Sequence, residues 1–227
     1  DQIVEAVREQ LPKSFRVDPT RAESPPPKTP EEALRAFRTS PGFEVQLVAA
    51  EPLLESPVAI DFGADGRVWV AEMRDYPSGM DGQGKPGGRV RVLSDADGDG
   101  RWERSEVVVD GVPFPTGLLC WGDGVLVCAA PDVWWFRPGT DGAKPWSGER
   151  LLRGFETHNF QARVNGLRWG LDGWVYGSGG LFGGTIQVLR TGRTVDCRNR
   201  DFRFRPDTGE FEPLGGVSQQ GRVRDDF

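Results

Sequence analysis

The most specific chemical motif of the chain is a run of alternating acidic residues, DADGDGRWERSE, at positions 95–106. Carboxylates at loop positions one, three and five, glycine at position six and glutamate at position twelve match the calcium-loop pattern. Calcium prefers six to eight oxygen ligands, and such a loop can supply most of them. The ligands that this pattern predicts are Asp95, Asp97, Asp99, the main-chain carbonyl of Arg101, and Glu106.

The residues on both sides of this loop are typical of strands and not of the helices of an EF-hand. We therefore expect a loop between two strands that calcium stabilises, and not a sensor that opens. Two alternatives stay open. Glu106 can lie too far along its strand to reach the ion, which would leave three aspartates and water, or the loop can be an acidic surface turn without a metal.

The only histidine, His158, begins a second polar cluster, HNFQARVN, ahead of an aromatic-rich run. An imidazole can accept a proton from a substrate hydroxyl near neutral pH, and a guanidinium can stabilise an anionic oxygen. His158 is thus the candidate base, with Arg163 and Asn165 as candidates that orient a substrate. The alternative is that His158 is a hydrogen-bonding loop residue without a catalytic role.

The three cysteines, Cys120, Cys128 and Cys197, form no CxxC pair and no disulfide framework. Cys120 and Cys128 flank a Gly-Asp-Gly turn. A two-residue turn would place them on opposite sheet faces, whereas a three-residue turn would place them opposite each other. Most of the tryptophans stand at strand positions, which favours a packing role, although one or two could stack against a sugar.

Composition and charge exclude several classes of protein. The chain has 227 residues, a net charge of -6, 31 glycines and 18 prolines, which describe a turn-rich all-β protein. No basic field is present to hold nucleic acid or an anionic membrane surface. No stretch approaches the roughly 20 apolar residues of a transmembrane helix. Cations and neutral solutes are the partners that fit this balance.

The first 41 residues differ from the rest. Apolar residues at helical spacing predict an amphipathic helix over residues 1–17, and a proline-rich linker follows over residues 18–30. A threonine N-cap, a proline and two acidic residues then predict a short helix over residues 31–41.

Residues 42–227 repeat one plan: an apolar run, an Asp-Gly turn, and a second run of β-branched and aromatic residues. The turn aspartates are Asp65, Asp123 and Asp172, and residues 200–214 form a looser fourth copy. A repeat of about 50 residues predicts a β-propeller of about four blades, cut off at its C-terminal side. A β-sandwich is the alternative, but it would not repeat the same hairpin.

Several segments together resemble a known family: TPEEALRAFRTSPGFEVQLVAAEPLLESPVAIDFGADGRVWVAEMRDYP, GGRVRVLSDADGDGRW, PFPTG, DGVLVCAAPD, RVNGLRWGLDGWVYG and GRVRDDF. They are similar to the predicted membrane-bound dehydrogenase domain of planctomycete and verrucomicrobial proteins. The resemblance implies a six-bladed, TolB-like propeller, distantly similar to the soluble glucose and sorbosone dehydrogenases, which use pyrroloquinoline quinone and calcium. Many such proteins continue into a c-type cytochrome domain, which implies a periplasmic or extracytoplasmic location with membrane association through other parts.

The resemblance also implies positions for the quinone contacts, and the chain departs from the pattern there. The catalytic histidine position falls on Ala162, and the arginine and asparagine positions fall on Val217 and Ser218. His158 could reach the cavity from a longer loop, and Arg163 or Arg222 could replace the lost cation.

Two functions follow as expectations. The first is a dehydrogenase that oxidises a sugar or an alcohol and passes electrons to a quinone or a cytochrome. The second is a non-catalytic propeller that binds carbohydrate or a protein partner. Because one fold serves many functions, the fold cannot decide between them. Aromatic side chains around a cavity without a base would favour binding, whereas His158 beside Arg163 and a free volume would favour catalysis.

Overall fold

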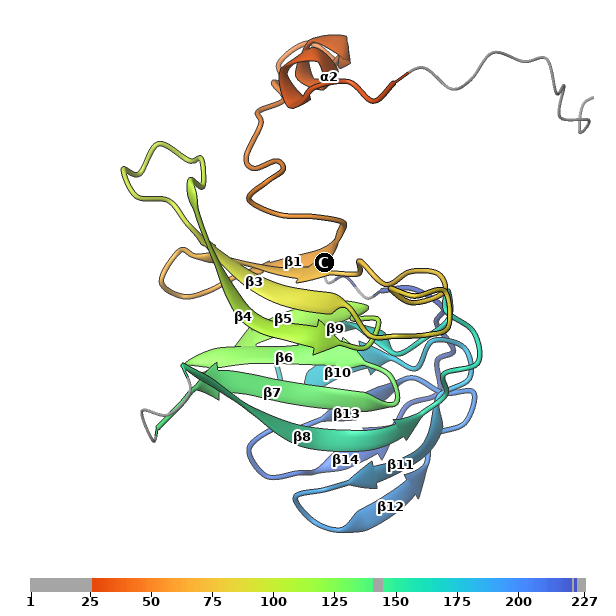
Figure 1. The fold of residues 1–227 in the computed structure, drawn as a ribbon. Coiled ribbons are helices and arrows are strands. Elements are labelled where there is room, and N and C mark those ends of the chain that lie inside the picture. The colour runs from red at the N-terminus through yellow and green to blue at the C-terminus, as the bar shows by residue number, and fades with distance from the viewer. Residues whose placement is uncertain (1–25, 141–144, 222, 224–227) are drawn as a thin grey trace, which may run out of the picture. The chain divides into compact units, whose positions relative to one another are not determined.

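The computed structural model describes residues 26–140, 145–221 and 223 (Figure 1). The chain divides into two units, residues 1–46 and residues 47–227. The helix predicted over residues 1–17 and most of the linker predicted over residues 18–30 lie outside the described residues.

In the first unit, helix α2 spans Pro30–Ala36. Its N-cap is Thr29, whose hydroxyl accepts a hydrogen bond from the Glu32 N–H, while the Glu32 carboxylate accepts one from the Thr29 N–H. This reciprocal capping box satisfies two of the amide groups that a helix N-terminus leaves free. No residue of α2 is buried, so the caps and helix propensity stabilise it more than packing does.

The second unit is built from antiparallel strands, which confirms the prediction of a mostly β chain. The first sheet has the order β1-β2-β3-β4. Its strands are β1 (Pro57–Phe62), β2 (Val68–Glu72), β3 (Gly88–Ser94) and β4 (Arg104–Val112). The Asp-Gly turn at residues 65–66 joins β1 to β2, and a glycine with φ of 78° makes the reversal possible.

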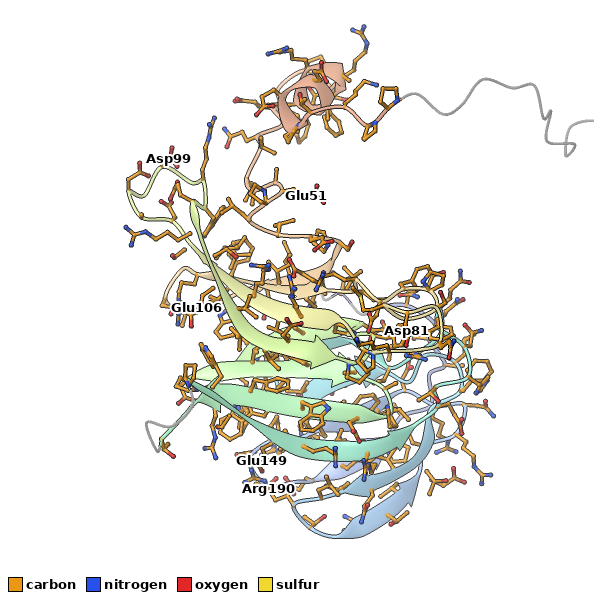
Figure 2. The ribbon with its side chains drawn as sticks, viewed as in Figure 1. Glu51, Asp81, Asp99, Glu106, Glu149 and Arg190 are labelled. Atoms are coloured by element: carbon orange, nitrogen blue, oxygen red, sulfur yellow. The ribbon has the colours of Figure 1, made fainter. Side chains whose placement is uncertain are left out.

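The second sheet has the order β12-β11-β8-β7-β6-β5. Its strands are β5 (Gly117–Trp121), β6 (Gly124–Ala129), β7 (Asp132–Pro138), β8 (Trp146–Phe155), β11 (Gly184–Val188) and β12 (Arg193–Asp196). The hairpin of β11 and β12 pairs with β8 through β11. Arg190, in the turn of this hairpin, forms an ion pair of 3.0 Å with Glu149 on β8 (Figure 2).

The third sheet has the order β14-β13-β10-β9. Its strands are β9 (Asn165–Trp169), β10 (Val175–Ser178), β13 (Phe202–Phe204) and β14 (Phe211–Pro213). The sequence predicted about four blades, with residues 200–214 as a fourth unit. In the structure β13 and β14 pair with β10 instead, so this hairpin completes the third sheet, and the described strands form three sheets.

The three sheets pack through two apolar layers. One layer lies between the first and second sheets, and the other lies between the second and third. The first layer includes Trp69, Ala71, Val90, Leu118 and Val127. The second includes Leu126, Leu167, Phe202, Phe204 and Phe211. Strand β1 contacts β5, and β5 contacts β9, so the first strands of successive sheets lie next to one another.

The turn between β5 and β6 determines on which sheet faces Cys120 and Cys128 lie. Trp121 pairs with Gly124, which leaves a two-residue turn. Cys120 and Cys128 therefore point to opposite faces and pack into different apolar layers. All three cysteines are free thiols. No helix within the described ranges is long and apolar enough to cross a membrane.

Candidate functional site

The strands β1, β5 and β9 have two ends with different chemistry. We call the end where they begin, at Pro57, Gly117 and Asn165, the loop end, and the other the turn end. A pocket of about 490 Å³ opens at the loop end. Its lining includes Arg74, Tyr76, Thr116, Gln161, Arg163 and Asn165. In Figure 1 the loops that follow β2 and β8 gather on this side. The structure thus brings two of the three sequence-predicted catalytic residues to one cavity.

Arg163 is a rigid, nearly buried part of this pocket, with 6% of its surface exposed. Its guanidinium carbon lies 4.8 Å from the centre of the Phe114 ring and 4.3 Å from that of Phe160. Nη2 donates a hydrogen bond of 2.8 Å to the Thr157 carbonyl. Burial lowers the pKa of Arg163 from its ordinary value, and the nearby charge of Asp75 opposes that shift.

Asn165 joins two segments that are distant in sequence. Its Nδ2 donates to the carbonyls of Arg163 and Gln219, both at 2.8 Å, and its Oδ1 accepts from the Gly221 N–H at 2.6 Å. Because the whole amide is committed to main-chain groups, Asn165 positions the wall of the pocket. This arrangement does not leave it free to orient a substrate.

His158 lies on the same loop as Arg163 but does not line the pocket. Its side chain is 58% exposed, and its ring packs against Phe182 with centroids 4.4 Å apart. Nδ1 lies 3.4 Å from a carboxylate oxygen of Glu156. The fourth sequence-predicted residue of this region, Arg222, lies outside the described part of the chain.

Sequence reasoning missed the contribution of the loop that follows β2. The Tyr76 hydroxyl accepts a hydrogen bond of 3.3 Å from the Gln161 side chain, 85 residues away. Beneath the pocket, buried Asp75 accepts the N–H groups of Gly87 and Phe114 through Oδ2. The only signal in the sequence was the polar run Arg-Asp-Tyr before a glycine-rich loop. Nothing local showed that it would meet the His158 loop.

The positions at which pyrroloquinoline quinone contacts were implied do not fit that cofactor. Ala162 is buried and cannot exchange a proton, and Val217 is an exposed apolar side chain. The Ser218 hydroxyl donates to Asp201 at 2.6 Å, which commits it to the protein. The donor set that would hold the quinone is therefore not present at these positions.

The loop between β3 and β4 brings four carboxylates together. One ligand oxygen from each of Asp95, Asp97, Asp99 and Glu103 lies within 4.8 Å of the others. This acidic cluster could hold a metal ion such as calcium, whose ligands are hard oxygens. The N–H of Gly100, at 2.9 Å, contributes most to holding the pKa of Asp95 below its ordinary value. The charged form of Asp95 is thereby favoured before any ion arrives.

Glu103 takes the place in this cluster that the motif gave to Glu106. The Glu106 carboxylate accepts a hydrogen bond of 3.1 Å from the Trp146 indole, and Figure 2 shows it farther along β4 than the loop that carries Asp99. The motif missed Glu103 because it assumes a helix after the loop, whereas β4 is extended and moves position twelve away from the turn. Arg101 donates its N–H to Asp99 at 2.8 Å.

A second pocket, of about 940 Å³, lies at the turn end. Its lining includes Phe62, Asp65, Cys120, Trp121, Asp123 and Trp169. Burial, with the charge of Asp61 second, raises the pKa of Cys120 to about 12. Its thiol therefore stays protonated and weakly nucleophilic at neutral pH.

Comparison with known protein families identifies the family to which the chain belongs. The domain family of unknown function DUF7133 matches residues 29–227, and the chain therefore belongs to this family. A comparison with curated proteins gives no match.

Proposed function

We propose, for this member of the DUF7133 family, that the three sheets are blades of a β-propeller and that the loop-end pocket binds a sugar or another polyol. The contacts from β1 to β5 and from β5 to β9 support the first part. In a propeller the first strand of each blade lies nearest the shared axis, and loops from successive blades meet at one end of it. The resemblance to six-bladed dehydrogenase domains supports the same arrangement.

The chemistry of the pocket carries the second part of the proposal. Tyr76 and Phe160 supply aromatic faces, while Gln161, Arg163 and Gln220 supply polar groups. Sugars are bound in this way, with stacking against rings and hydrogen bonds to hydroxyl groups. Among the described residues that line the pocket there is no aspartate, glutamate or histidine that could act as a base. Its volume falls within the roughly 300–1,000 Å³ of small-molecule sites.

Calorimetry with a panel of neutral monosaccharides, alditols and sugar acids tests sugar binding. We expect one molecule to bind per chain. Gln161→Ala should weaken binding about tenfold, because the loss of one good hydrogen bond costs about 1.4 kcal/mol. The matched control is Gln187→Ala on β11, an exposed glutamine away from the pocket. No heat from any member of the panel would contradict the proposal.

Oxidation of a bound sugar or alcohol is the second candidate function, and the His158–Glu156 pair favours it. A carboxylate 3.4 Å from Nδ1 can orient an imidazole. His158 would take the hydroxyl proton while the carbon gives its hydrogen as a hydride to a bound quinone, which would then release two electrons to a cytochrome and its protons to solvent. This candidate would place the chain in an extracytoplasmic compartment.

Dye reduction measured over the same panel separates the two candidates. If the chain is a dehydrogenase, His158→Gln should lower kcat at least about a hundredfold, the usual range for loss of a general base, and leave the sugar Kd unchanged. Sugar binding without dye reduction, with and without added quinone, would reject the dehydrogenase candidate and leave the binding function in place.

We also propose that the acidic cluster between β3 and β4 binds calcium and fixes this loop. The support is the four carboxylates of the cluster and their position on an exposed turn. A loop of this kind matches the weak calcium sites of extracellular modules. The role is structural, because the loop belongs to the turn end of its sheet and the sugar pocket belongs to the loop end.

A further inference from the structure

We infer that the ligand of the loop-end pocket carries a carboxylate, so that its class is an acidic sugar such as a uronate. The inference rests on the sugar-binding function proposed above and adds what the sugar must carry. The residue that favours a ligand with a carboxylate is Arg163.

Arg163 is held in a set orientation and keeps a donor without a protein partner. The neighbouring rings of Phe114 and Phe160, with centroids 4.8 Å apart, both pack against its guanidinium, and Nη2 donates to the Thr157 carbonyl. Nε is buried and has no hydrogen-bond partner among the described residues. A guanidinium packed against aromatic rings is held in one orientation, and its planar fork of donors is how arginine recognises the two oxygens of a carboxylate.

The charge of Arg163 has no direct counter-ion. Asp75 lies near enough to act through its field, but its Oδ1 and the Arg163 Nε are both buried without a hydrogen-bond partner, and no ion pair within 4.0 Å joins the two side chains in the described structure. Asp75 uses Oδ2 for the main-chain N–H groups of Gly87 and Phe114. Burial therefore works against the charged form of Arg163, and a bound anion would offset this cost.

The described lining of the pocket carries cationic side chains and no anionic one. Arg74 and Arg163 both line it, and no carboxylate does so among the described lining residues, although the whole chain has a net charge of -6. Arg74 is already paired with Glu55 at 2.7 Å, which leaves Arg163 as the cation available to a ligand. A neutral sugar would leave this buried charge with only the field of Asp75, whereas a uronate would supply a direct partner.

Three ligands on the unmodified full chain test the inference without any substitution. Calorimetry should compare glucuronate with glucuronamide, its neutral isostere, and with glucose. We expect glucuronate to bind at least tenfold more tightly than the other two, and the preference to shrink in high salt. Glucose 6-sulfate as a fourth ligand separates a carboxylate from a tetrahedral anion, and tighter binding of the sulfate would overturn the carboxylate assignment.

Arg163→Lys then tests the residue itself, with Arg168→Lys on β9 as the matched control. Lysine keeps the charge but loses the planar fork, so the preference for glucuronate should fall to threefold or less, while the control keeps it. Circular dichroism checks that both variants fold, and the ligand comparison above decides the question if one does not. A full preference in folded Arg163→Lys would overturn the inference. Equal binding of all three sugars would overturn it while leaving sugar binding intact, and no binding at all would overturn both.

Discussion

The two ends of strands β1, β5 and β9 are built in different ways. At the turn end an aspartate closes its own hairpin: Asp65 accepts the N–H of Arg67, two residues away, and Asp172 accepts that of Trp174. The main chain of Cys120 adds two longer-range bonds at this end, one to Asp61 and one from the Trp169 indole. At the loop end the hydrogen bonds join distant segments. The Thr116 hydroxyl donates to the Val164 carbonyl, 48 residues away, and Asn165 reaches Gln219, 54 residues away.

The difference shows at which end of the strands a specific binding site can be built in such a protein. Local turns define each hairpin separately, so losing one of them affects only that hairpin. The loop end exists only when three sheets are assembled, and its pocket is therefore tied to the integrity of the whole unit. Four experiments, taken from the largest expected effect to the smallest, test this contrast.

Asn165→Ala should have the largest effect, because it removes three hydrogen bonds to main-chain groups, one of them buried and two part-buried. We expect the free energy of unfolding to fall by about 2–4 kcal/mol, since each unsatisfied buried group costs about 1–3 kcal/mol. Urea denaturation followed by fluorescence measures this change. Gln187→Ala, an exposed control, should stay within about 0.5 kcal/mol of the unmodified protein. A loss as small as the control's would show that the loop end is no more interdependent than the turn end.

Asp97→Ala should abolish the stabilisation that calcium gives to the unmodified protein. At a calcium concentration of 100 times Kd, this stabilisation is about 2.7 kcal/mol. Thermal unfolding with and without calcium measures it, and Asp207→Ala, an exposed aspartate outside the cluster, is the matched control. Equal calcium effects in Asp97→Ala and in the control would mean that the acidic cluster holds no ion.

Glu103→Gln and Glu106→Gln form a pair that decides which carboxylate completes the loop. Because Glu103 joins the cluster and Glu106 bonds to Trp146, we expect only the first to weaken calcium binding, by about tenfold, or 1.4 kcal/mol. Calorimetry at constant ionic strength measures both. The reverse order would restore the ligand set that the sequence motif predicted.

Asp65→Ala should have the smallest effect, about 0.5–1 kcal/mol, because the side chain is exposed and its bonds to Arg67 are local. Partial burial raises the pKa of Asp65, but the hydrogen bonds and charge of Arg67 outweigh burial and the net shift is downward. A lowered pKa means that the stabilisation is present above the ordinary aspartate value of 3.8 and is lost as the pH falls through the folded value. The variant should thus differ less from the unmodified protein at pH 3 than at pH 7. Asp123→Ala, in a turn without such bonds, is the control for urea denaturation at both pH values.

The same contrast explains how much could be predicted from the sequence. Asp-Gly turns and alternating strands are local patterns, so the mostly β fold, the hairpins and the calcium-type loop could all be predicted. The pairing of β13 with β10 could not, because a hairpin and its partner strand are chosen by packing. Arg163 could be recognised as a candidate, but Phe114, which flanks its guanidinium, lies 49 residues earlier in the chain and only the assembled sheets bring it there.

The hairpin of β11 and β12 has a consequence for how the protein behaves in a crowded solution. Without it, the ten residues of β8 would leave a long row of unpaired amides on the rim of the second sheet, which another chain could extend. With the hairpin in place, the edge strand is β12, which has four residues and includes the charged side chains of Arg193 and Asp196. A short edge strand with charged side chains is a poor template for pairing between chains, so the hairpin of β11 and β12 protects the protein against aggregation.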